Sequence, residues 1–349
     1  MKKTICFTYV GIANIVVAKK EKQPVRLLGT ERSKMMKRND FPALWFPPLT
    51  YYKEEGKIDF EKMECELAKI YPYSQGVLIP GSTGDAWVLD DARQEEIVRF
   101  FLKGFSFGRF AVMLGALKPT ADETLQAVVH WCDVLCSAAG TDSIIDAMEK
   151  LQVKAFVFCV PNGEQDPARQ YEEMSRILAC GLPMAFYQLP GVTGVTVDPA
   201  LIAKLAAENS NLIVAKDSGG MDEMAKSGLL NDRLMLLRGA EGDPSALVRG
   251  ESPCYDGLLL STVNCFAKEY AAFMDDAVTY RGFGDVIGEV FEEAGKAPVS
   301  NAFSDAVRAI CHAREYGEKA AETPCYCYNG KELPVRLLRV ARQSLDAHL

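Results

Sequence analysis

A lysine and a tyrosine stand near the ends of two neighbouring apolar runs of the sequence. Lys216 follows the run LIVA (212–215), and Tyr187 lies in AFYQLP (185–190). A buried ammonium costs several kcal/mol unless it pairs with a carboxylate or loses its proton. A neutral lysine amine attacks carbonyl carbon to form a Schiff base, and a nearby tyrosine hydroxyl can carry the protons. The pair predicts this chemistry. A plainer interpretation makes Lys216 a structural ion pair with Asp217, and Tyr187 a core aromatic whose hydroxyl bonds the backbone.

The sequence GSTGD (81–85) follows another apolar run and offers hydroxyls and backbone N–H groups between two glycines. Such a turn can bind an anion, and the hydroxyls of Ser82 and Thr83 suit a carboxylate. The G-K-[ST] of a nucleotide P-loop is missing, so phosphate binding is not indicated. The alternative is a plain strand-to-helix turn in which either hydroxyl caps the chain.

The elements that position these residues alternate along the chain from residue 41 onward. Near-continuous hydrophobicity, rather than alternation, indicates strands that are buried on both faces. Eight such runs are predicted as strands, over 41–47, 76–81, 110–116, 154–161, 183–190, 212–218, 234–240 and 257–262.

Amphipathic segments separate these runs and predict helices. Clear examples cover 59–71, 90–105, 166–181 and 198–209, and the long segment 117–153 predicts two helices, the second over 142–152. Strand and helix repeated eight times predict an α/β fold, a (β/α)₈ TIM barrel with a C-terminal helical appendage. The alternative, an open doubly wound sheet, usually carries G-x-G-x-x-G after its first strand, and none occurs here.

The domain organisation predicted from the sequence has three parts. Residues 1–38 form a basic extension with ten basic and two acidic side chains, and the extension need not belong to the fold. Its apolar stretch 4–18 resembles a signal-peptide core but is followed by KKEKQ rather than a cleavage site. The barrel is expected over 39–275 and further helices over 276–349.

Composition excludes several classes of protein. The 349 residues carry 39 Lys and Arg against 47 Asp and Glu, a net charge of −8, which argues against nucleic acid as a partner. No apolar run reaches the roughly 20 residues of a membrane span. The 11 cysteines lie mostly in apolar runs and indicate reduced thiols in a cytoplasmic protein. Neither they nor the three histidines have the spacing of a metal site.

Taken together and in this order, three motifs resemble those of the dihydrodipicolinate synthase / N-acetylneuraminate lyase family of pyruvate-dependent class I aldolases. They are GSTGD (81–85), YQLPGVTGV (187–195) and KDSGG (216–220), within a similarity that covers roughly 41–275. The resemblance implies an enzyme without metal or cofactor.

The resemblance also implies a role for each matching residue. Lys216 would form the Schiff base with pyruvate or another 2-oxo acid, and Tyr187 would relay protons. Ser82 and Thr83 would hold the keto acid's carboxylate, and Ser218 would contact substrate. The implied partners are a 2-oxo acid and an aldehyde, in a homo-oligomer that is commonly a tetramer.

The sequence departs from the family pattern on the side of the second substrate. Gly191 and Val192 stand where the synthase has an arginine, and Pro161-Asn162-Gly163 replaces an aromatic pair. Glu241 is followed by Gly242 where the sialic-acid lyase has a second acid. The leading prediction is a lyase or aldolase. The alternatives are a 2-keto-3-deoxy sugar acid dehydratase, a dihydrodipicolinate synthase, and a barrel that binds a 2-oxo acid without turnover.

Overall fold

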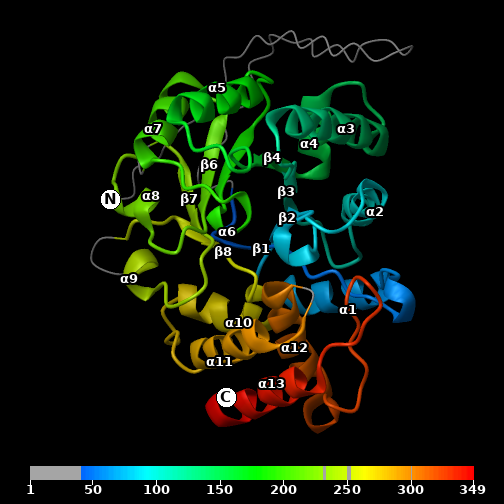
Figure 1. Cartoon of the computed structure of the whole chain (residues 1–349). Helices are drawn as coiled ribbons and strands as arrows, with labels where there is room; N and C mark the ends of the chain where they lie inside the picture. The colour runs from blue at the N-terminus through cyan, green and yellow to red at the C-terminus, as the bar shows by residue number, and fades with distance from the viewer. Residues whose placement is uncertain (1–40, 231–232, 250–252, 300) are drawn as a thin grey trace. The chain divides into compact units, whose positions relative to one another are not determined.

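Eight parallel strands follow one another in sequence order around a closed barrel (Figure 1). The computed structural model describes residues 41–230, 233–249, 253–299 and 301–349. The strands are β1 Leu44–Phe46, β2 Gly76–Ile79, β3 Ala111–Gly115, β4 Val153–Phe158, β5 Met184–Gln188, β6 Leu212–Asp217, β7 Met235–Arg238 and β8 Gly257–Leu259. Nearly all their residues are buried, as expected of strands covered on both faces. The predicted barrel is confirmed.

Each predicted run overlaps its strand but extends past the strand's carboxyl end. The residues beyond β4 show why, because Cys159 and Val160 remain buried although the ladder has ended. Hydrophobicity reports burial and not hydrogen bonding, so the runs could not locate the strand ends.

The described residues form two compact units. The first comprises Phe41, Ala111–Arg238 and Cys254–Asp256, and contains β3 to β7. Its helices are α3 Ala121–Ala139, α4 Ile144–Leu151, α5 Pro167–Leu178, α6 Pro190–Thr193, α7 Pro199–Glu208 and α8 Glu223–Lys226. Helices α3 and α4 confirm the two helices predicted between the third and fourth strands.

Local capping explains where several of these helices begin and end. The side chains of Thr120 and Ser143 accept backbone N–H bonds at the starts of α3 and α4, and Gly140 ends α3 in the left-handed conformation. Asp166 and Asp198 cap α5 and α7 ahead of a proline at the first helical position, as the two D-P-A sequences predict.

The second unit comprises Pro42–Phe110, Gly239–Pro253 and Gly257–Leu349, and contains β1, β2 and β8. Its helices are α1 Phe60–Ile70, α2 Asp91–Leu102, α9 Ser245–Val248, α10 Val263–Met274, α11 Phe283–Lys296, α12 Ala302–Tyr316 and α13 Val335–His348. Helices α11, α12 and α13 pack against one another and confirm the C-terminal helical region (Figure 1).

The predicted basic extension over 1–38 lies outside the described residues, and the division into 39–275 and 276–349 stays a prediction. The ten cysteines of the described residues are free thiols. No helix within those residues has the length and apolar character needed to cross a membrane.

We expect His312 of α12 to make the stability of the protein depend on pH. Its Nε2 lies 3.1 Å from the carbonyl oxygens of both Ala320 and Thr323 and therefore donates a proton to them. Burial lowers the pKa of His312, so the folded state favours the neutral ring. We expect full stability above the unfolded-state pKa of about 6.5 and a loss as pH falls below it.

Urea unfolding at pH 7.5 and pH 5.5 measures this effect. His312→Gln keeps an N–H donor but cannot titrate, so its free energy of unfolding should change less between the two conditions than that of the wild type. An equal change in both proteins would contradict the assignment.

Candidate active site

Lys216 and Tyr187 lie side by side on adjacent strands of the first unit. They are register partners on β6 and β5, so both side chains point to the same face of the sheet. The Lys216 Nζ lies 3.8 Å from the centre of the Tyr187 ring, and the two residues are 5% and 3% exposed. The structure therefore brings together the two residues that the sequence singled out for Schiff-base chemistry.

Within the described residues, the Lys216 amine forms no ion pair with a carboxylate. Asp217, the partner in the plainer interpretation, points to the opposite face because side chains alternate along a strand. Its carboxylate accepts hydrogen bonds from the Gly219 N–H and the Tyr255 hydroxyl, both at 2.9 Å. The Tyr187 hydroxyl likewise has no backbone partner among those residues. The structure therefore shows neither the Lys216–Asp217 ion pair nor the backbone hydrogen bond of the Tyr187 hydroxyl that the plainer interpretations require.

A buried polar network lies behind Lys216 on the outer face of β6. The Tyr255 hydroxyl lies 2.9 Å from Asp217 Oδ2 and 3.0 Å from Asp222 Oδ1, and Asp222 also accepts from Arg238 Nε at 2.9 Å. Burial and then the two carboxylates raise the pKa of Tyr255 well above its usual value, so it acts as a donor. Through Asp217 and Asp222, the network fixes both ends of the segment 217–222 that follows Lys216. Tyr255 could not be predicted from the sequence, because it lies 38 residues from Asp217 and in no motif.

We expect Tyr255→Phe to lower the free energy of unfolding by about 1–3 kcal/mol, because two buried carboxylates lose a donor. Urea unfolding followed by fluorescence measures the change. Tyr171→Phe is the matched control, since Tyr171 also bonds a carboxylate, that of Glu208, but at the surface. Equal effects of the two substitutions would argue against a structural role for the buried network.

Ser218 begins the loop after β6 and is fixed through its backbone. Its N–H donates to the Gln188 carbonyl oxygen at 3.0 Å. Its hydroxyl oxygen is buried and has no hydrogen-bond partner among the described residues. That hydroxyl is free to bond a ligand.

The loops after β4 and β5 are joined to each other within the first unit. The Gly163 N–H donates to the Thr193 carbonyl oxygen at 2.8 Å, and Gln165 Nε2 donates to the Gly194 carbonyl oxygen at 3.1 Å. Val192 of α6 is 41% exposed. An apolar side chain therefore occupies the position at which the synthase pattern has an arginine.

Ser82 and Thr83 belong to the second unit, where they form a 3₁₀ turn, Ser82–Gly84, after β2. The Ser82 hydroxyl accepts from the Trp87 indole N–H at 3.0 Å, and the Thr83 hydroxyl lies 2.6 Å from that of Ser261. Neither hydroxyl caps the helix that follows, because Asp90 caps α2. The capping alternative for the turn is therefore wrong.

Glu241 connects the loop after β7 to the end of β8 within the second unit. Its carboxylate accepts from the N–H groups of Ser261 and Thr262 at 2.8 and 3.2 Å, and from the Thr262 hydroxyl at 2.6 Å. It thus fixes the backbone of the residue that bonds Thr83. The sequence drew attention to Glu241, but Ser261 and Trp87 were missed because their bonds to the turn follow no spacing rule.

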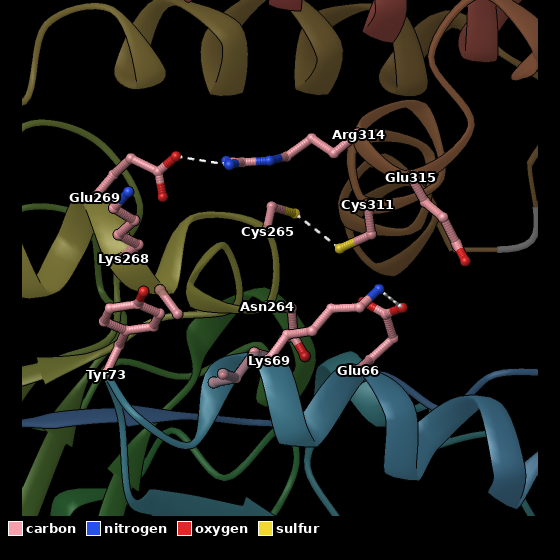
Figure 2. A pocket seen from close by; sticks show the side chains of 12 residues that line it. Glu66, Lys69, Tyr73, Asn264, Cys265, Lys268, Glu269, Cys311, Arg314 and Glu315 are labelled. Atoms are coloured by element: carbon pink, nitrogen blue, oxygen red, sulfur yellow. Dashed lines mark hydrogen bonds and ion pairs between the residues drawn. The ribbon is translucent and has the colours of Figure 1, made fainter.

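A cavity of about 270 Å³ lies among α1, α10 and α12 of the second unit (Figure 2). Cys265 and Cys311 face each other there with their sulfurs 3.2 Å apart, and Arg314 pairs with Glu269 at 2.7 Å. None of the residues predicted for catalysis or substrate binding lines this cavity. Across the described residues, no group of three or more His, Cys, Asp or Glu is arranged to hold a metal ion.

Fold and site define the class of protein as a (β/α)₈ barrel with a buried lysine on its sixth strand and a tyrosine beside it on the fifth. The chain belongs to the dihydrodipicolinate synthetase family, whose model matches residues 40–279. The resemblance seen in the sequence is thereby confirmed.

Curated relatives cover different activities within that family. The chain is 27% identical over 205 residues to a 4-hydroxy-tetrahydrodipicolinate synthase of Hyphomonas neptunium, across 58% of this chain and 64% of the relative. It is 26% identical over 221 residues to YagE of Escherichia coli, a putative 2-dehydro-3-deoxy-D-gluconate aldolase, across 63% and 66% of the two chains. The chain thus spans about half to two thirds of the length of the curated relatives that it matches.

Solved structures share the fold over most of the chain. The dihydrodipicolinate synthase of Aquifex aeolicus superposes with a TM-score of 0.66 at 18% identity, covering 88% of this chain and 98% of the other. CdNal of Clostridium difficile, solved in complex with mannosamine, gives 0.64 at 14% identity, with 88% and 99% coverage. At these identities the likeness establishes the fold alone.

Proposed function

We propose that the chain is a class I lyase or aldolase that cleaves or condenses a 2-oxo acid through a Schiff base on Lys216, with pyruvate as its keto partner. The observation that carries the proposal is the buried Lys216 amine, which lies 3.8 Å from the Tyr187 ring centre. That amine has no carboxylate partner within the described residues and so is free to bond carbon.

The chemistry balances with these groups. The Lys216 amine bonds to the keto carbon, and the keto oxygen takes one proton from Tyr187 and one from the nitrogen. Water then leaves, the nitrogen keeps its other hydrogen as an iminium, and the deprotonated Tyr187 oxygen can take a proton from the neighbouring carbon. The iminium withdraws electrons from the neighbouring carbon. That carbon then loses a proton to give an enamine that attacks an aldehyde. In reverse, the bond to the aldehyde fragment breaks, and hydrolysis restores the amine.

The keto acid's carboxylate would be bound by the turn after β2. The Ser82 hydroxyl already accepts from Trp87, so its own proton is available to a carboxylate oxygen. Thr83 shares a hydrogen bond with Ser261, and the unpartnered Ser218 hydroxyl offers a further contact. Metal or cofactor plays no part in this proposal.

Val192 favours lyase or aldolase activity over the synthase alternative. A second substrate with a carboxylate at that position would meet an exposed apolar side chain instead of a cation. A neutral aldehyde avoids this mismatch. A dehydratase of sugar-derived 2-oxo acids uses the same iminium and is the second candidate.

Borohydride trapping tests the Schiff base directly. The wild-type chain is incubated with pyruvate and sodium borohydride, and the modified peptide is identified by mass spectrometry. We expect one reduced pyruvate on Lys216. An adduct elsewhere, or none with any of several 2-oxo acids, would falsify the Schiff-base proposal.

Product analysis then separates the candidate reactions. Incubated with a panel of 2-keto-3-deoxy acids, a lyase releases pyruvate and an aldehyde, whereas a dehydratase releases water and keeps the carbon chain whole. An adduct on Lys216 without turnover of any panel member would favour the alternative of a binding barrel.

We further propose a cytoplasmic homo-oligomer, a tetramer as the family resemblance implies. The free thiols of the described residues support a reducing compartment. Light scattering after size-exclusion chromatography measures the assembly, and a monomeric mass would contradict it.

A further inference from the structure

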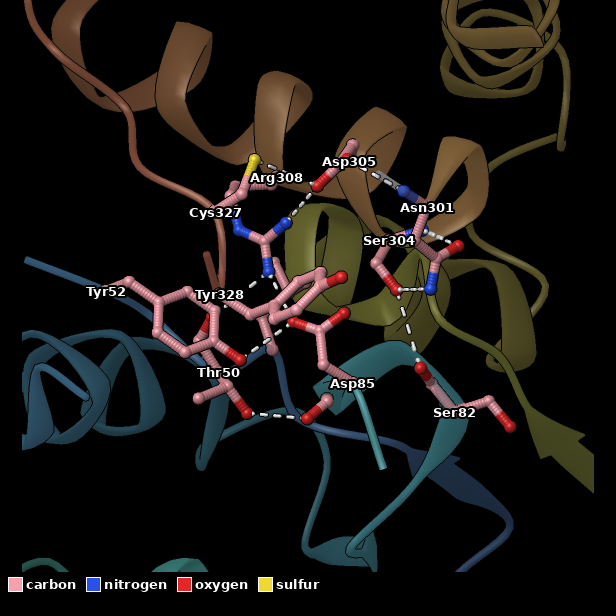
Figure 3. Close-up of polar contacts among 12 residues, drawn as sticks. Thr50, Tyr52, Ser82, Asp85, Asn301, Ser304, Asp305, Arg308, Cys327 and Tyr328 are labelled. Carbon is pink, nitrogen blue, oxygen red and sulfur yellow. Dashed lines mark hydrogen bonds and ion pairs between the residues drawn. The ribbon is translucent and has the colours of Figure 1, made fainter. Parts of the chain in front are cut away.

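The turn that carries Ser82 and Thr83 is held by a charged side chain from the distant helix α12 (Figure 3). Asp85 ends this turn, and its Oδ2 accepts hydrogen bonds from Arg308 Nη2 and from the Tyr52 hydroxyl, both at 2.9 Å. Asp85 and Arg308 are each 2% exposed, so this ion pair is fully inside the second unit.

The same guanidinium links further groups to the turn. Its Nη1 donates to Asp305, and its Nη2 also lies 3.2 Å from the Thr50 carbonyl oxygen. The Thr50 hydroxyl donates to the Gly84 carbonyl oxygen at 2.8 Å. Ser304, on the same helix as Arg308, donates to the Ser82 carbonyl oxygen at 3.4 Å. The backbone of the turn is therefore fixed at both ends.

The conformation of the turn requires such support. Asp85 has φ = +66°, in the left-handed region that costs energy for residues other than glycine. Gly84 packs so closely that a Cβ atom would lie 2.7 Å from the Pro48 carbonyl oxygen. Burial raises the pKa of Asp85, and Arg308 opposes that shift by supplying the countercharge. Without this cation a buried carboxylate would remain uncompensated.

We propose that Arg308 is a positioning residue for binding of the keto acid's carboxylate, acting through Asp85 on the hydroxyls of Ser82 and Thr83. The inference rests on the proposed function, because it assigns the turn to the substrate. Arg308 itself touches no reacting atom. Helix α12 lies beyond residues 40–279, which the family model matches, so the family model does not include Arg308.

Titrating the borohydride trap with pyruvate tests the proposal. Arg308→Lys keeps the charge but loses the planar fork that reaches two carboxylates and a carbonyl. We expect the half-saturating pyruvate concentration to rise about tenfold, the effect of one lost charge-assisted hydrogen bond, with the maximal adduct unchanged. Arg314→Lys is the matched control, because Arg314 lies on the same helix but pairs with Glu269. Its half-saturation should stay within about twofold of wild type.

A double-mutant cycle separates positioning from general destabilisation. Thr83→Val removes one of the hydroxyls on which Arg308 is proposed to act. If Arg308 acts through the turn, adding Arg308→Lys to Thr83→Val should weaken pyruvate binding much less than it does in the wild type. If the fold-changes in half-saturating pyruvate concentration of the two single variants simply multiply in the double variant, the proposal is overturned.

Hydrogen–deuterium exchange of the peptide that covers 81–86 gives a readout that does not depend on trapping. Arg308→Lys should speed its exchange, and Arg314→Lys should not. Tyr52→Phe, which keeps the ion pair and removes only one bond to Asp85, replaces Arg308→Lys in every arm if that variant does not fold. No adduct in the wild type would refute the proposed function alone, whereas unchanged exchange with unchanged half-saturation would refute the role of Arg308.

Discussion

Lys216→Ala should abolish the borohydride adduct and lower turnover by on the order of 10⁵–10⁶-fold, as when a covalent nucleophile is removed. No other described lysine lies on a strand with a tyrosine as its register partner, so we expect no second amine to take over. Trapping followed by peptide mass spectrometry and a pyruvate-release assay measure both losses.

The fold should survive this substitution. Removing the lysine side chain leaves a cavity, which lowers the free energy of unfolding. Removing the buried amine also removes the free-energy penalty of its burial, which raises the free energy of unfolding, so the two effects oppose each other. We expect the free energy of unfolding to stay within about 2 kcal/mol of wild type. Circular dichroism and urea unfolding check this, so that a lost adduct is not mistaken for a lost fold.

Lys204 provides a matched control for Lys216→Ala. Its Nζ lies 3.9 Å from the centre of the Tyr171 ring, nearly the geometry of the Lys216–Tyr187 pair, but on the exposed surface of α7. Lys204→Ala should form the adduct as well as the wild type. An adduct that persists in Lys216→Ala would end the assignment of the nucleophile.

Tyr187→Phe should leave pyruvate binding intact and slow turnover by about 10²–10⁴-fold, the contribution of a lost proton-transfer group. Phenylalanine preserves the ring beside the Lys216 amine, so only the hydroxyl is removed. Steady-state kinetics should show a fall in kcat with little change in KM, and trapping at long times should still modify Lys216.

Tyr171→Phe controls for the loss of a tyrosine hydroxyl beside a lysine. Wild-type kinetics for Tyr187→Phe would exclude the hydroxyl as the proton relay. An effect confined to KM would instead indicate that the hydroxyl only binds substrate.

The sequence predicted the barrel because its strands are buried on both faces and therefore appear as continuous apolar runs. It also predicted the Lys216–Tyr187 pair, since both residues stand near the carboxyl ends of such runs and those ends meet on one side of a parallel barrel. The predicted Asp217 alternative failed for a local reason: neighbouring residues on a strand face opposite sides.

The supporting residues could not be predicted in the same way. Arg308 lies 223 residues from Asp85, and Ser261 lies 178 residues from Thr83. In the sequence Arg308 stands in an ordinary helical segment, with nothing to distinguish it from the arginines that stay at the surface. Only the folded chain shows that Arg308 and Asp305 are the charged side chains of α12 that are buried, and that Arg308 supplies the countercharge to Asp85.

The ion pair between Asp85 and Arg308 also bears on how the protein is made. A chain emerging from the ribosome displays the residues of the hydroxyl-bearing turn long before residue 308 has been synthesised. Until that arginine arrives, the aspartate must stay hydrated or take up a proton, and the turn lacks its finished shape. If the turn binds the keto acid as proposed, that binding reaches full strength only in the last stage of synthesis, and chain fragments that end before α12 should bind the keto acid more weakly.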